Sequence, residues 1–60
     1  MTKQELIDIL INDFKLMFPE TNKWQREQLK LRLEYLDFED LKLLVTDDMI
    51  KRFKKSKSND

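Results

Sequence analysis

The sequence predicts an all-α fold: a small bundle of three helices, or four if there is a break near Thr46, completed by self-association. First, the 60 residues contain no glycine and one proline, and glycine supplies the left-handed positions of tight β-hairpin turns. Second, apolar residues recur at the helical spacings of three and four. Third, so short a domain buries only about 60% of its unfolded surface. Since cysteine and histidine are absent, neither disulfides nor a zinc cluster can stabilise this core, and we expect tight packing and a second copy of the chain.

The first helix is predicted over residues 3–18. Thr2 and Glu5 have the spacing of a capping box, and Pro19 disfavours helical geometry at the residue before it. The main apolar arc of this segment spans roughly 140°, wider than the stripe of about 100° on an ordinary surface helix. Ile9 and Leu16 lie outside even this arc. We therefore expect the first helix to be covered on two sides.

The second helix is predicted over residues 23–36, after the break that Pro19 begins. Asn22 and Gln25 offer another capping pair. The apolar residues of the segment divide into two stripes, which indicates two neighbours: the first helix on one side, and the third helix or another chain on the other. One stripe consists of Trp24, Leu31 and Tyr35, and the other of Leu29, Leu33 and Leu36.

The remainder of the chain is predicted to form helices over residues 38–45 and 47–55. Asp37 is a natural N-cap, and Leu36 and Leu41 occupy hydrophobic-staple positions around it. A single helix over residues 38–55 is the alternative, but the β-branched pair Val45-Thr46, followed by two aspartates, favours a break. Residues 1–55 then form one domain, and residues 56–60 a disordered basic and polar tail.

Composition argues against an enzyme. Histidine and cysteine, the usual general base and strongest nucleophile, are missing, and without glycine neither common phosphate-binding loop can form. The acidic groups Asp37, Glu39, Asp40 and Asp47, Asp48 lack the ligand spacing of a calcium loop and fit helix starts, where acids interact favourably with the dipole. We expect no catalytic residue, cofactor, metal or small-molecule substrate.

The sequence also gives indications of the protein's cellular location and of the genome that encodes it. No apolar run approaches the about 20 residues of a membrane span, and the first residues lack the pattern of a signal peptide, so we expect a cytoplasmic protein that does not bind membranes. Alanine and glycine are absent and lysine exceeds arginine, which indicates an AT-rich genome such as that of a low-GC bacterium or its phage.

The first functional hypothesis is a non-catalytic protein-interaction module that binds and regulates or adapts a larger partner protein, in the manner of a phage or bacterial inhibitor. It is expected to form a dimer. Large amphipathic side chains are common at interface hot spots, and some apolar residues are hard to hide within three helices. The partner-binding residues predicted on these grounds are Ile9, Leu16, Trp24, Leu31 and Tyr35.

The alternative is an accessory protein that binds nucleic acid, including DNA, through the basic end of the chain. The net charge is zero, with 12 basic and 12 acidic residues, but the last part of the sequence is strongly basic. Cations there would contact phosphates, and an aromatic ring would stack on a base. A solvated helix end explains the same residues. The candidates are Lys51, Arg52, Phe53, Lys54, Lys55 and Lys57.

Overall fold

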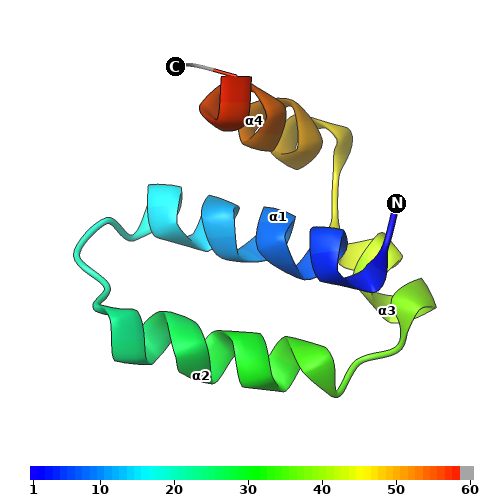
Figure 1. Cartoon of the computed structure of the whole chain (residues 1–60), viewed down its shortest axis with the longest axis horizontal. Coiled ribbons are helices and arrows are strands. Elements are labelled where there is room, and N and C mark those ends of the chain that lie inside the picture. Colours follow the sequence, from blue (N-terminus) through cyan, green and yellow to red (C-terminus); the bar gives the residue numbers. More distant parts are fainter. Residues whose placement is uncertain (59–60) are drawn as a thin grey trace.

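A computed structural model describes residues 1–58, with side chains as far as Ser56. In this part of the chain four helices and no strand are present (Figure 1), so the all-α prediction is confirmed. The helices are α1 (Lys3–Met17), α2 (Lys23–Glu34), α3 (Phe38–Leu44) and α4 (Asp47–Ser58). None of them is long and apolar enough to cross a bilayer.

The break near Thr46 is present, because α3 ends at Leu44 and α4 begins at Asp47. Residues 56–58, which the sequence pattern assigns to the tail, belong to α4 in the structure. The last turn of α4 is rich in lysine, and cations at a helix C-terminus interact favourably with the dipole, which explains why the helix continues. Residues 59–60 of the predicted tail lie outside the described residues.

The first two helices begin at side-chain caps that the sequence predicts. Thr2 Oγ1 accepts a hydrogen bond from the Glu5 N–H at 3.2 Å. At the start of α2, Asn22 Oδ1 accepts from the Gln25 N–H at 2.9 Å, and Gln25 Oε1 accepts from the Asn22 N–H at 3.1 Å. These bonds satisfy N–H groups that a helix leaves without an intrahelical partner. Local sequence therefore fixes where both helices start.

The caps of α3 and α4 differ from each other. Asp37 is the N-cap of α3, but its side chain makes no capping hydrogen bond; its carbonyl accepts from the Leu41 N–H at 3.0 Å. Thr46 Oγ1 accepts from the Met49 N–H at 3.3 Å, and the Met49 sulfur lies 3.4 Å from the Thr46 N–H. Thr46 thus begins a new helix instead of continuing α3.

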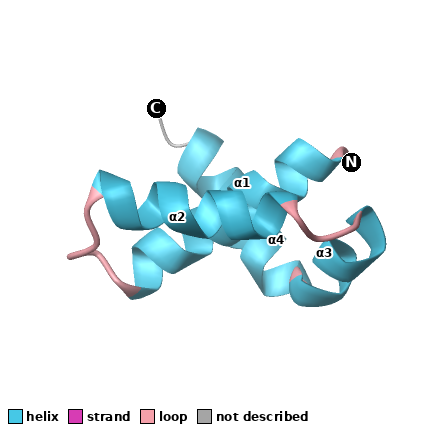
Figure 2. Ribbon diagram, turned by 90° about the horizontal axis from the view of Figure 1, so that it is seen from below, coloured by secondary structure: helices cyan, strands magenta, loops and turns pink. Residues whose placement is uncertain are grey.

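Helix α1 is the centre of the molecule, since it packs against each of the other three helices. Helices α2 and α4 lie on opposite sides of α1, and α3 lies near its amino-terminal end (Figures 1 and 2). The prediction that the first helix is covered on two sides is confirmed. The arrangement differs from the expected bundle in that the other helices meet mainly through α1.

The buried core joins α1, α2 and α3. Leu6, Ile7, Leu33 and Leu41 form one cluster, and burial of each such side chain contributes about 1.5–3 kcal/mol. The α2 stripe that the sequence composes of Leu29, Leu33 and Leu36 faces this cluster. The partly buried residues packed against it are Leu10, Ile11, Leu29, Leu36, Phe38 and Val45.

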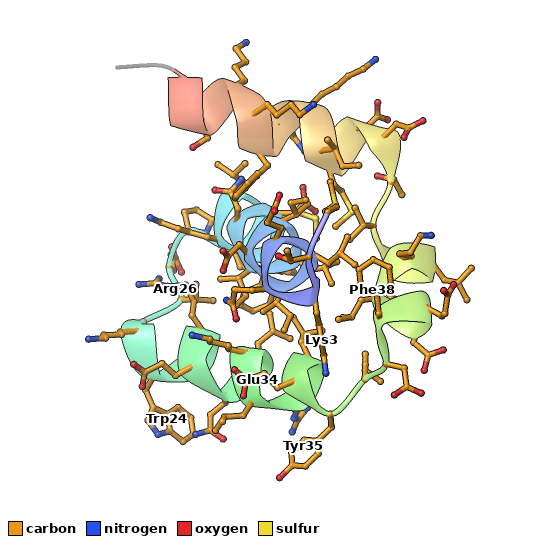
Figure 3. The ribbon with its side chains drawn as sticks, turned by 45° about the vertical axis from the view of Figure 1, so that its right-hand side comes forward. Lys3, Trp24, Arg26, Glu34, Tyr35 and Phe38 are labelled. Carbon is orange, nitrogen blue, oxygen red and sulfur yellow. The ribbon has the colours of Figure 1, made fainter. Side chains whose placement is uncertain are left out.

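Polar contacts hold α2 antiparallel to α1 at both ends. Lys3 Nζ donates to the carbonyl of Glu34 at 2.8 Å, which joins the start of α1 to the end of α2 (Figure 3). At the other end, Arg26 Nη1 donates to the carbonyl of Thr21 at 2.8 Å, and Thr21 Oγ1 donates to the carbonyl of Phe18 at 2.9 Å. These bonds add to the burial of Leu33 in the core, which turns the opposite face of α2 outward.

Candidate protein-interaction surface

The outer face of α2 carries the most exposed aromatic side chains of the described chain. Trp24, Leu31 and Tyr35 are 65%, 51% and 90% exposed. They lie seven and four residues apart, so Trp24 and Leu31 share one face of α2 and Tyr35, the C-cap with helical backbone angles, continues this face. Trp24 and Tyr35 point away from α1 (Figure 3). We call these three residues, with Gln28 between them, the α2 stripe.

The α2 stripe has charged edges of opposite sign. At about 100° per residue, Glu27 and Glu34 fall along one edge of it, and Arg32 falls along the other. All three side chains are exposed, and none of them makes an ion pair within the described part of the chain. The stripe therefore combines an apolar centre with charges that are available to a partner.

A second apolar surface lies where α1 ends. Leu16 is 54% exposed, and its neighbours Met17 and Phe18 are exposed as well. The ring of Phe18 lies 5.2 Å from that of Phe14, measured between centroids, so its position is set by α1. We call Leu16, Met17 and Phe18 the α1 end patch.

The structure places Ile9, one of the predicted partner-binding residues, inside the protein. Ile9 is only 1% exposed. It lies one turn before Asp13 on the same side of α1, and Asp13 contacts α4, so α4 covers this side. The cover does not extend to Leu16, about two turns further along. Sequence periodicity identified the second apolar side of α1, but it gave no indication of how far α4 would cover it.

Sequence reasoning missed the ion pair between Asp13 and Arg52. Arg52 Nη2 and Nε lie 2.7 and 2.8 Å from Asp13 Oδ1. Asp13 is buried, whereas the Arg52 side chain is 49% exposed. One signal was present: Asp13 follows Ile9 by four residues, on an apolar side of the helix. Nothing local indicated its partner, because the two residues are 39 positions apart.

The predicted nucleic-acid-binding residues do not form one free basic surface. Arg52 holds α4 against α1 through Asp13, and Phe53 is half-buried. Lys51, Lys54 and Lys55 are exposed along α4. The side chain of Lys57 lies outside the described residues.

The described surface holds an open groove beside the α2 stripe. No group of three or more His, Cys, Asp or Glu side chains that could hold a metal ion occurs among residues 1–58. A groove of about 360 Å³ lies between α1 and α2, open to solvent. Its walls carry amide, guanidinium and apolar groups, which suit contact with another chain more than acid–base chemistry. The lining residues are Phe14, Trp24, Gln25, Gln28, Leu29 and Arg32.

Comparisons with protein-family models, with curated proteins and with solved structures find no match to this chain.

Proposed function

We propose that this protein is a small non-catalytic interaction module that binds other protein chains through exposed apolar side chains, and thereby regulates or adapts a larger partner. The observation that carries this proposal is the α2 stripe. Its aromatic residues are among the types enriched at interface hot spots, and they lie exposed on a helix whose opposite face is fixed in the core.

The stripe gathers three exposed apolar side chains on one face of α2, with the polar Gln28 between two of them. Single exposed apolar residues are normal on soluble proteins, whereas a contiguous apolar patch rimmed by polar groups marks an interaction site. Trp24, Leu31 and Tyr35 lie on one face, with Glu27 and Arg32 along the edges. The α1 end patch supplies a second contact surface, so one copy of the module offers two places for protein partners.

A capture experiment tests the proposed role. The full chain serves as bait in lysate of a low-GC bacterium, with nuclease and at moderate salt. We expect a protein to be retained through both treatments. Leu31→Gln combined with Tyr35→Gln should reduce its capture at least tenfold, because most of the energy of an interface resides in a few such residues. Helicity should be unchanged, since both side chains are exposed.

One control variant and one contrary outcome complete the experiment. Glu39→Gln, an exposed change on α3 away from the stripe, should leave capture unchanged. Recovery of nucleic acid alone, or of proteins that nuclease releases, would contradict the proposal and support the role of the α4 lysines instead. In that case Lys51→Ala with Lys54→Ala should abolish binding, and the binding should weaken steeply with salt.

A further inference from the structure

We infer that the α2 stripe is the contact surface for a second copy of this chain, and that the two α2 helices pair side by side in parallel as a short coiled coil. This inference rests on the proposed interaction role of the stripe and names its partner. It follows from the spacing of the stripe residues, from the charges along its edges and from the fixed outward orientation of α2.

The stripe has the spacing of a coiled-coil seam. Successive steps from Trp24 to Gln28, Leu31 and Tyr35 are four, three and four residues, which is the alternation of d and a positions in a heptad. Leu31 occupies a d position, where leucine is usual in two-stranded coiled coils. Gln28 occupies an a position, where one polar residue fixes register at some cost in stability. The core-facing residues Leu29 and Leu33 fall outside this seam.

The charged edges specify the direction of pairing. In this register Glu27 and Glu34 are g positions and Arg32 is an e position. A parallel pair brings each g residue close to the e residue five positions later on the other chain. Glu27 of one copy therefore meets Arg32 of the other, and two-fold symmetry makes this ion pair twice. An antiparallel pair would instead place acidic edge beside acidic edge, which is repulsive.

These charges have no competing partner within one copy. Five residues is not a spacing at which side chains meet on a single helix, so Glu27 and Arg32 of one chain do not neutralise each other. Both are exposed, and neither makes an ion pair among residues 1–58. Glu27 and Arg32 can therefore pair only between two chains.

The size of the stripe indicates a weak dimer. A pair of 12-residue helices buries less than the about 1,200 Å² of a standard interface. We therefore expect dimerisation at a Kd on the order of 100 µM. Such a dimer leaves both α1 end patches uncovered, and a larger partner would meet two of them at once, which increases its avidity.

The test is a charge exchange measured by sedimentation equilibrium on the full chain. Glu27→Arg and Arg32→Glu should each weaken dimerisation about tenfold, because each replaces two attractive pairs by two repulsive ones. The double variant should restore the original affinity, since it re-forms both pairs with the signs exchanged. The substituted residues are exposed, and circular dichroism would check that the fold is kept.

A second measurement reports the geometry directly. The chain has no cysteine, so Gln28→Cys provides a single thiol at the predicted seam. A parallel pair places the two thiols opposite each other, and mild oxidation should give a disulfide-linked dimer. Glu39→Cys, on α3, should give little at the same concentration.

Three outcomes would overturn the inference. The wild-type chain stays monomeric to 1 mM, or Glu27→Arg strengthens association, as an antiparallel pair requires. The third is equal cross-linking of the Gln28→Cys and Glu39→Cys variants. One combination of results would overturn this inference alone. In it, the wild-type chain is monomeric, yet the Leu31→Gln, Tyr35→Gln variant fails to capture a protein that the wild type retains. The proposed function would then stand with a different partner on the stripe.

Discussion

Replacing Ile9 by alanine is expected to lower the free energy of unfolding by about 2–4 kcal/mol, whereas Leu16→Ala should lower it by less than about 1 kcal/mol. Both residues lie on the same side of α1, but Ile9 is buried and Leu16 is more than half exposed. Truncation of Ile9 removes buried methyl groups and leaves a cavity beneath α4, whereas truncation of Leu16 removes surface that already contacts water.

Urea unfolding followed by circular dichroism measures this difference. A domain of this size has only about 3–5 kcal/mol of stability to lose, so the Ile9→Ala population should be partly unfolded even without urea. Leu16→Ala is the matched control, because it is the same kind of truncation on the same helix. Similar losses for the two variants would contradict the placement of α4 over Ile9.

The second large effect concerns the pair of Asp13 and Arg52, and its two halves are not equivalent. Arg52→Met should cost about 3 kcal/mol, because it leaves a buried carboxylate without a partner. Asp13→Asn should cost about 1 kcal/mol: the guanidinium is half exposed, so water can solvate it, and the amide oxygen can still accept a hydrogen bond.

The double variant Asp13→Leu, Arg52→Met separates the charge effect from packing. Replacement of an ion pair by apolar side chains of similar size is often neutral, so this variant should be more stable than Arg52→Met alone. Unfolding free energies of the wild type, Asp13→Leu, Arg52→Met and the double variant, obtained from urea unfolding, form a double-mutant cycle. Equal losses for Arg52→Met and Asp13→Asn would mean that the carboxylate is better hydrated than its burial implies.

Much of the local structure could be predicted from the sequence because its causes are local. Thr2 and Asn22 begin helices through bonds to residues three positions later, and Pro19 separates α1 from α2 because of its own geometry. Thr46 was ambiguous in sequence, since it suits both a helix interior and a cap. Its bond to the Met49 N–H in the structure resolves the question in favour of a cap.

The placement of α4 could not be predicted, because it depends on contacts between residues far apart in the chain. Arg52 belongs to a run of cations that the sequence presents as one basic surface, yet one of them pairs with Asp13. The same contact buries Ile9. By contrast, the sequence does predict that the two apolar stripes of α2 cannot both face α1. It left open whether the third helix or another chain would cover Trp24, Leu31 and Tyr35, and in the structure these residues are exposed.

Helix α4 is attached to the side of α1 opposite α2. The molecule therefore has two layers whose amides differ in protection from hydrogen exchange. The buried cluster draws on α1, α2 and α3, and no α4 residue is among the fully buried side chains of the described chain. The amide hydrogens of α4 should therefore exchange with solvent by local opening, at a lower free energy than those of α1 and α2.

Such an opening would do more than expose backbone. When α4 lifts away, Ile9 and the carboxylate of Asp13 become accessible together, and the apolar surface of α1 extends from Ile9 to Leu16. The closed and the opened molecule would therefore differ in the apolar surface that α1 exposes. A partner that binds the open state more tightly than the closed state would increase the population of the open state. Hydrogen exchange would then slow for the α1 amides, which the partner covers, and quicken for the α4 amides.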